Sequence, residues 1–163
     1  MKISVPMNVE VNAAGGRHEA LAAVGSNIVS GFPGIGKSTV FRDERLRVAD
    51  SDSSTFDKTH FPANYIEHIQ KTAPTVDYIL VSSHDVVRAA LVEQNMPFVL
   101  VYPSRDQKTD YLKRYVERGS PAAFIKLMDE KWDDFLAQCE KQTGCVHLVL
   151  QPGQYLADVI YAQ

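Results

Sequence analysis

Short apolar runs alternate with longer segments of helical spacing from Ser26 to the end of the chain. The runs are rich in β-branched residues and apolar almost throughout, which is typical of strands that are buried on both faces of a parallel sheet. We therefore predict five strands, at residues 27–30, 46–50, 78–82, 98–102 and 146–150.

The segments between these runs place apolar residues three and four positions apart, as on one face of a helix. Gly119 and Gly144 follow two of the segments, and glycine is typical of helix ends. The alternation of strands and helices predicts a three-layer α/β/α sandwich around a five-stranded parallel sheet. The predicted helices begin at Gly36 or Lys37 and after Pro62, cover residues 85–95, 106–118 and 121–141, and end with a short segment that holds Leu156, Val159 and Ile160.

Residues 1–25 lack a strong period and include an Ala- and Gly-rich stretch at 12–16. We expect this segment to be an N-terminal arm or extension. A length of 163 residues is that of one ordinary domain, so we expect residues 26–163 to form a single core.

The composition, 45% apolar and 23% charged, is that of a soluble globular protein. The longest apolar runs, such as 98–102, are too short to cross a bilayer, and the first residues lack the apolar stretch of a signal peptide. We therefore expect a cytoplasmic protein without membrane binding. Seventeen Lys and Arg against twenty Asp and Glu give a net charge of −3, which argues against general nucleic-acid binding.

One motif carries a specific chemistry. The segment Gly31-Phe32-Pro33-Gly34-Ile35-Gly36-Lys37-Ser38 fits the pattern G-x-x-x-x-G-K-[ST] at every fixed position. A predicted strand lies directly before it and a predicted helix directly after it, which is the context that a phosphate-binding loop requires. We therefore predict that this segment, called the phosphate loop below, binds a nucleotide, and that Thr39 also contacts it.

The residue types follow from the chemistry of a phosphate group. Glycines at positions 31, 34 and 36 allow backbone conformations closed to other residues and let amide groups approach phosphate oxygens. Lys37 is expected to place a positive charge on the β- and γ-phosphates, and the Ser38 hydroxyl is expected to bind Mg²⁺. Thr39 is expected to reach the α-phosphate.

The absence of two GTPase motifs excludes one class of nucleotide-binding protein. GTPases need D-x-x-G and N-K-x-D motifs, and neither occurs in the chain. The remaining pattern resembles the small P-loop kinases, which include nucleoside monophosphate kinases and shikimate and gluconate kinases. It is also similar to nucleotide-kinase-like proteins of phages and prophages, through the segments at 31–34, 50–54, 81–84 and 151–155. The resemblance covers residues 26–160 and implies a sheet order of 2-3-1-4-5.

Asp50 and Asp52 end the second predicted strand, at the edge where ligands bind in open α/β sheets. Either carboxylate is a candidate for holding Mg²⁺ through water. Asp52 is also a candidate base for an attacking hydroxyl, as in shikimate-type kinases. A turn or N-cap role is the alternative, because Asp and Ser favour such positions.

The third predicted strand ends at Ser82, and the resemblance implies that Ser82, His84 and Arg88 line the acceptor pocket beside Asp50. The alternative for Arg88 is a solvated side chain. No aspartate ends this strand before Ser82, so a Walker B carboxylate is missing from its usual place. Magnesium is then expected to depend on Ser38, phosphate oxygens, water and Asp50 or Asp52.

Arg114 and Arg118 lie four positions apart in a basic segment that precedes Gly119-Ser120-Pro121. The resemblance implies that these arginines act as lid residues, which close over the transferring phosphoryl group. An ion-paired solvated face is the alternative, because Asp110 lies four residues before Arg114.

Together these features predict a magnesium-dependent enzyme that transfers the γ-phosphoryl group of ATP to a small acceptor, most simply a nucleoside monophosphate. The segment after the second strand offers no arginine to hold an acceptor phosphate. That departure favours a hydroxyl acceptor, such as a nucleoside, a sugar or a shikimate-like acid, with Asp52 as the base. A nucleotide-binding regulatory module without turnover is the third alternative, and the oligomeric state stays open.

Overall fold

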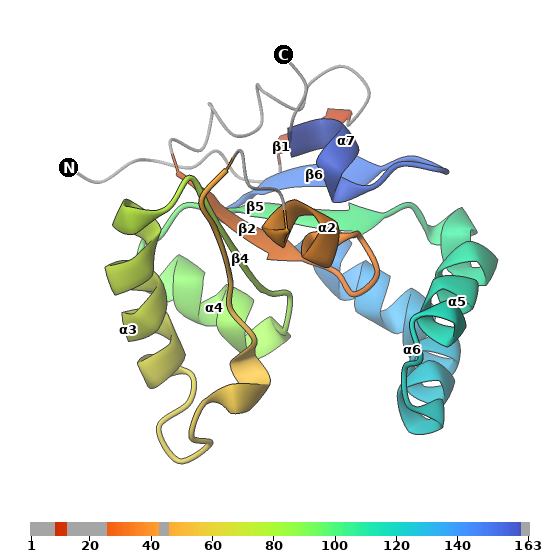
Figure 1. Ribbon diagram of the computed structural model, residues 1–163, viewed down its shortest axis with the longest axis horizontal. Coiled ribbons are helices and arrows are strands. Elements are labelled where there is room, and N and C mark those ends of the chain that lie inside the picture. The colour runs from red at the N-terminus through yellow and green to blue at the C-terminus, as the bar shows by residue number, and fades with distance from the viewer. Residues whose placement is uncertain (1–8, 13–25, 43–45, 161–163) are drawn as a thin grey trace.

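The computed structural model describes residues 9–12, 26–42 and 46–160, and these form a parallel sheet with helices on both faces (Figure 1). Every strand pairing in this part of the chain is parallel. The order across the sheet is β1-β6-β5-β2-β4-β3. The strands are β1 (Val9–Asn12), β2 (Ile28–Gly31), β3 (Val48–Asp50), β4 (Tyr78–Ser82), β5 (Val99–Pro103) and β6 (Val146–Leu150).

The five predicted strands are present, and their order, β3-β4-β2-β5-β6, is the predicted 2-3-1-4-5. The predicted number is too low by one, because β1 adds a sixth strand beside β6, with Val9 opposite Val146. Four residues are too few to show a period of their own, so this strand has no clear signal in the sequence. The rest of the expected N-terminal arm lies outside the described residues.

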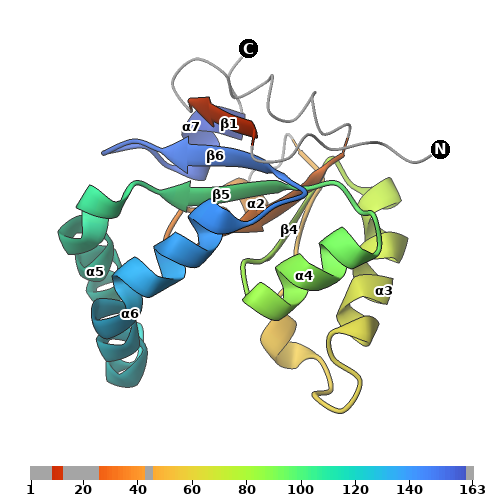
Figure 2. The same ribbon diagram turned by 180° about the vertical axis from the view of Figure 1, so that it is seen from behind.

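The helices are divided between the two faces of the sheet. Figure 1 shows α2 and α7 over the near face, and Figure 2 shows α4 and α6 over the opposite face. Each predicted helix is found, and no helix among the described residues has the length and apolar character to cross a bilayer. The helices are α2 (Lys37–Phe41), α3 (Ala63–Thr72), α4 (Asp85–Glu93), α5 (Lys108–Glu117), α6 (Ala122–Lys141) and α7 (Leu156–Ile160), with 3-10 turns η1 (Ser53–Thr55), η2 (Ala73–Thr75) and η3 (Arg105–Gln107).

The core explains why the central strands read as unbroken apolar runs. Every residue of β2 and β5 is buried, as expected for strands covered on both faces. Trp132 of α6 packs edge to face against Phe32, with ring centroids 5.6 Å apart. Because Phe32 directly follows β2, its packing in the core fixes the start of the phosphate loop.

The parallel arrangement brings three strand ends to one edge of the sheet. Both β2 and β3 pair with β4, where Gly31 of β2 lies opposite Ser82 and Asp50 of β3 lies opposite Leu80. The phosphate loop, the acidic residues after β3 and the polar residues after β4 therefore meet at the carboxyl edge, where open α/β sheets bind ligands.

Candidate functional site

The phosphate loop connects β2 to α2 and depends on its glycines. Gly34 and Gly36 have φ angles of 91° and 96°, in the region that side-chain-bearing residues rarely adopt. A Cβ atom on Gly31 would lie 2.6 Å from Cδ1 of Ile35. The Ile35 side chain is fully buried in the core, so a nucleotide can contact Ile35 only through its backbone.

The carbonyl groups of this loop are tied to the helices around it. The Tyr115 hydroxyl donates to the Pro33 carbonyl at 2.8 Å, and Arg114 donates to the Gly34 carbonyl at 2.8 Å. The amide of Leu156, at the start of α7, donates to the Ile35 carbonyl at 2.7 Å. Three successive carbonyl oxygens are therefore held by protein donors.

The amide groups of the same loop remain available. Among the described residues, the amides of Gly34, Gly36, Lys37 and Ser38 have no hydrogen-bond acceptor. A run of free amides in a glycine-rich turn forms a concave binding site for an anion. The loop conformation therefore agrees with the sequence prediction that this segment binds phosphate oxygens.

Lys37 lies inside this site. Its Nζ atom donates to the Gly31 carbonyl at 3.0 Å. Burial lowers the pKa of Lys37, and the positive charge of Arg118 lowers it further, whereas Asp50 and Asp52 raise it. A partly desolvated ammonium gains more from an added phosphate charge than an exposed one would, because less water screens the interaction.

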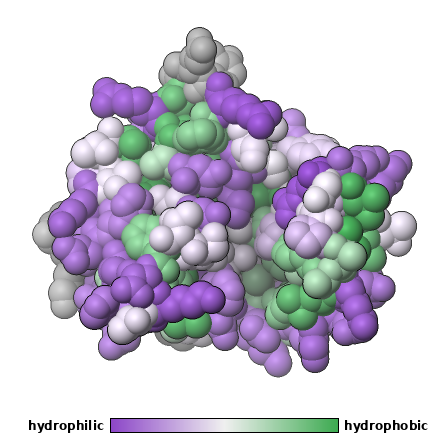
Figure 3. Space-filling view, turned by 60° about the horizontal axis from the view of Figure 1, so that its bottom comes forward, coloured by the Kyte–Doolittle hydropathy of each residue, from purple (hydrophilic) through white to green (hydrophobic). Residues whose placement is uncertain are grey.

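A cleft of about 520 Å³ opens beside the phosphate loop. Figure 3 shows a hollow in this face of the molecule, with hydrophobic residues gathered on the side of α5 and α6. One wall is polar and consists of Lys37 together with residues at the ends of β3 and β4 and on α4. The other wall is apolar and consists of Phe32 of the phosphate loop and residues of α6. The residues used below are Lys37, Asp50, Asp52, Ser82, His84 and Arg88 on the polar side and Phe32, Phe124, Leu127, Met128 and Phe135 on the apolar side.

The two aspartates differ in environment. Burial raises the pKa of Asp50, and the nearby charge of Lys37 opposes this shift. Asp52 caps η1 by accepting a hydrogen bond from the Ser54 amide at 2.9 Å, and the hydrogen bonds from Ser54 lower its pKa. The expected N-cap role of Asp52 is therefore present.

Tyr65 of α3 holds these strand ends together, and sequence analysis missed it. Its hydroxyl donates to the Ser51 carbonyl at 2.5 Å and accepts from the Ser82 amide at 3.1 Å. Burial raises the pKa of Tyr65 to about 12, so the hydroxyl stays protonated at neutral pH. The ring of Tyr65 belongs to the buried face of α3, but a single sequence does not show what a tyrosine hydroxyl contacts.

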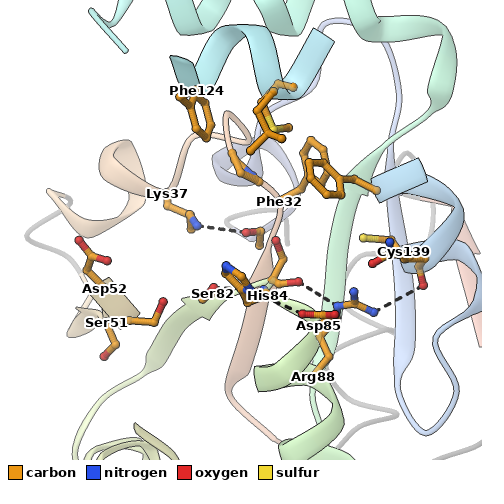
Figure 4. Close-up of a pocket in the computed structure, with 18 of the residues that line it drawn as sticks. Phe32, Lys37, Ser51, Asp52, Ser82, His84, Asp85, Arg88, Phe124 and Cys139 are labelled. Atoms are coloured by element: carbon orange, nitrogen blue, oxygen red, sulfur yellow. Dashed lines mark hydrogen bonds and ion pairs between the residues drawn. The ribbon is translucent and has the colours of Figure 1, made fainter. Parts of the chain in front are cut away.

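Ser82, His84 and Arg88 all line the cleft, and their contact with an acceptor stays a prediction. Ser82 Oγ accepts from the His84 amide at 3.1 Å, which shapes the turn between β4 and α4. Arg88 is only 5% exposed, so the alternative of a solvated side chain is wrong for this residue. Figure 4 shows its guanidinium group at the opposite end of the cleft from Lys37 and Asp52.

The two expected lid arginines occupy different places. Arg114 lies between the rings of Tyr111 and Tyr155, at 4.2 and 4.0 Å from their centroids, and pairs with Asp110 at 2.9 Å. With its bond to the Gly34 carbonyl, it supports the loop from outside and does not line the cleft. Reaching the phosphoryl group would require breaking these contacts.

Arg118 is the better placed of the pair. Its side chain is exposed, stacks over the rings of Tyr115 and Phe124, and donates to Ser120 Oγ at 2.8 Å. Its charge lowers the pKa of Lys37, so it acts electrostatically on the lysine of the phosphate loop. Arg118 stays a candidate lid residue.

The donor set suits magnesium that is shared with a nucleotide. Mg²⁺ commonly binds one or two protein oxygens and takes its other ligands from phosphates and water. Ser38 is exposed at the start of α2, and Asp50 and Asp52 lie near Lys37. The described residues hold no group of three or more His, Cys, Asp or Glu that would bind a metal by itself, and such a group is not needed for a shared ion.

We expect Gly34→Ala to disturb the loop far more than Gly119→Ala. Both glycines have positive φ, so both substitutions pay the left-handed penalty of about 1–2 kcal/mol. An added Cβ at Gly34 also lies 3.0 and 3.1 Å from the rings of Tyr115 and Tyr111, whereas at Gly119 it meets nothing within 4 Å. Thermal unfolding and ATP calorimetry should show a larger loss for Gly34→Ala, and equal losses in both variants would contradict this account.

The pKa of Lys37 predicts how nucleotide affinity depends on pH. Since this pKa is lowered, Lys37 loses its proton below the ordinary value of 10.5, and the attraction to phosphates disappears with it. Affinity for ATP with Mg²⁺ should therefore already fall at pH values below 10.5, by at most about tenfold per pH unit. Lys37→Met should bind more weakly and lack this fall, and a Lys37→Met profile parallel to that of the wild type would refute the assignment.

Comparison of the chain with protein-family models, with curated proteins and with solved structures finds no match. The functional assignment therefore depends on the geometry of the site: a loop with free amides, a lysine within it, and a cleft that joins the loop to two aspartates and a buried arginine.

Proposed function

We propose that the protein is a magnesium-dependent ATP phosphotransferase that acts on a small acceptor. One observation carries the proposal: a loop whose carbonyls are bound outward and whose amides are free opens into a cleft lined by Asp50 and Asp52. A protein that only bound a nucleotide would not need an adjoining space with acidic groups. A cleft of about 520 Å³ falls within the size range of small-molecule sites.

The nucleotide half of the site follows from the loop. The amides of the loop and Lys37 bind the β- and γ-phosphates, and Thr39 contacts the α-phosphate. Ser38 would bind Mg²⁺ through its hydroxyl. Either Asp50 or Asp52 would hold the ion through a water molecule. When bound, the ion neutralises charge that develops on the phosphate oxygens during transfer.

The acceptor half favours a hydroxyl group. Two carboxylates beside Lys37 repel an acceptor phosphate, and the segment after β3 carries no arginine to offset them. In the transfer, the acceptor oxygen forms a bond to the γ-phosphorus while Asp52 takes the hydroxyl proton. The bond from that phosphorus to the β–γ bridging oxygen breaks, and ADP leaves with the electron pair.

A nucleoside monophosphate is the second candidate acceptor. The apolar wall holds Phe32, Phe124 and Phe135, which can pack against a planar base, and Arg88 provides a positive charge in the same cleft. Transfer to a phosphate oxygen requires no base, so this candidate gives Asp52 only a supporting role.

An acceptor screen tests the proposal. Purified protein with Mg²⁺ and γ-labelled ATP should move label to a member of a panel of nucleosides, sugars, hydroxy acids and nucleoside monophosphates. Lys37→Ala should abolish the transfer, because it removes the charge that holds the terminal phosphates. Tight ATP binding with no labelled product from any acceptor would instead support a nucleotide-binding module.

The role of Asp52 is tested against a matched aspartate. Asp52 and Asp57 are both exposed, and each accepts a hydrogen bond from an amide two residues later, at 2.9 and 3.0 Å. Asparagine keeps this acceptor at either position but removes the basic carboxylate. With a hydroxyl acceptor, Asp52→Asn should lower kcat about 10²–10⁴-fold and Asp57→Asn should leave it nearly unchanged. A phosphate acceptor would show only a small effect of Asp52→Asn, which would refute the base assignment.

A further inference from the structure

The acidic segment Asp50-Ser51-Asp52 receives little support from the sheet. It begins at the end of β3, which is three residues long and lies at one edge of the sheet that the described residues form. The Ser51 amide continues the pairing with β4 through a bond to the Leu80 carbonyl at 2.9 Å. The direction in which the two carboxylates point therefore depends on contacts outside the sheet.

Ser51 makes these contacts from the middle of the acidic segment. Its carbonyl accepts from the Tyr65 hydroxyl at 2.5 Å, and its Oγ atom lies 2.9 Å from Nε2 of His68. Both partners belong to α3. Nε2 accepts the hydroxyl proton in one tautomer of the imidazole and donates to Oγ in the other, so the hydrogen bond forms in either case. The amide, the carbonyl and the hydroxyl of Ser51 are thus all engaged by protein groups.

The ring of His68 is itself held by aromatic packing. It contacts the ring of Phe56, with centroids 5.2 Å apart, and lies nearly parallel to the ring of Tyr65, with centroids 6.4 Å apart and an interplanar angle of 25°. Phe56 also packs edge to face against Tyr65 at 4.9 Å. His68 is half-buried among these rings, so packing sets the position of Nε2 relative to Ser51.

The anchoring of Ser51 determines where the flanking aspartates face. Side chains point in alternate directions along an extended segment. Ser51 is 9% exposed and bonded to α3, whereas Asp50 and Asp52 are more exposed and line the cleft. Both carboxylates raise the pKa of Lys37, and Figure 4 shows Ser51 and Asp52 at the end of the cleft that holds this lysine. Fixing Ser51 to α3 therefore keeps the two carboxylates on the side of Lys37.

We propose that His68 is a positioning residue, which acts through the Ser51 hydroxyl to hold Asp50 and Asp52 where they assist magnesium binding beside the phosphate loop. This inference rests on the proposed function, in which either aspartate holds Mg²⁺ through water. It gives a role to a histidine outside the residues that line the cleft. Groups that orient metal ligands typically change metal affinity about 10–100-fold when they are removed.

Magnesium-dependent binding tests this role in the full-length protein without an acceptor. Calorimetry with a non-hydrolysable ATP analogue, in EDTA and in Mg²⁺, gives the ratio of the two affinities, called the magnesium gain below. His68→Leu removes the hydrogen bond and keeps an apolar contact with the neighbouring rings. It should lower the magnesium gain about tenfold. The affinity in EDTA should stay nearly unchanged, because the loop amides and Lys37 are left in place.

Two further histidine variants separate the hydrogen bond from the packing of the ring. His68→Gln should keep most of the magnesium gain, because its side-chain amide can replace Nε2 as the partner of Ser51. His60→Leu is the matched control, at an exposed histidine that precedes α3, and should keep all of the gain. A histidine that only stabilised the fold would, when replaced, weaken binding in EDTA as much as in Mg²⁺.

Ser51→Ala tests whether His68 acts through the serine. This variant removes the hydroxyl and leaves the backbone bonds of residue 51 to Leu80 and Tyr65. It should lower the magnesium gain as His68→Leu does, and the double variant should lose no more than either single variant. Losses that multiply in the double variant would show that His68 acts by another route and would overturn the proposal.

The outcomes separate this inference from the proposed function. If the wild type does not bind the analogue, or binds it without a magnesium gain, the proposed function fails and the role of His68 fails with it. If the wild type shows a gain that His68→Leu or Ser51→Ala retains, or if His68→Leu weakens binding equally in EDTA and in Mg²⁺, only the positioning role is overturned. Circular dichroism checks that each variant is folded, and Ser51→Ala alone decides if His68→Leu is not.

Discussion

The anchoring of three loop carbonyls is the constraint on which the site depends. A backbone turn has as many acceptors as donors, so it attracts an anion only if its carbonyls are turned away and satisfied elsewhere. Tyr115, Arg114 and the amide of Leu156 satisfy those carbonyls, and the glycines allow the turn. The conformation that frees the loop amides is therefore a property of α5 and α7 as much as of the loop sequence.

The cleft is built on a different principle, in which opposite walls carry opposite chemistry. Parallel strand order brings the ends of β3 and β4 beside the loop, and Tyr65 joins these ends through one hydroxyl. The long helix α6 uses its buried stripe, including Trp132, for the core and leaves Phe124 and Phe135 partly exposed in the cleft. One helix thus stabilises the fold and supplies the apolar surface of the site.

Sequence reasoning predicted the strands, the helices, the loop and the meeting of three strand ends, because each depends on local spacing and on the rules of parallel sheets. It did not distinguish arginines that support the fold from arginines that line the cleft. Arg114 was expected to face the phosphates and instead packs between Tyr111 and Tyr155, whereas Arg88 is buried. The contact of Arg114 with Tyr155 and the burial of Arg88 depend on packing between distant segments, which spacing along the chain does not show. The short strand β1 escaped detection for the same reason, since only its pairing with β6 defines it.

The anchors of the phosphate loop also set an order of events during synthesis. The loop lies early in the chain, but its partners on α5 follow it by 80 and 82 residues, and the Leu156 anchor comes later still. A nascent chain that has released only the first strands from the ribosome holds the full motif without the contacts that anchor its carbonyls. Under the proposed function, the complete set of anchors for nucleotide binding is in place only after α7 has docked.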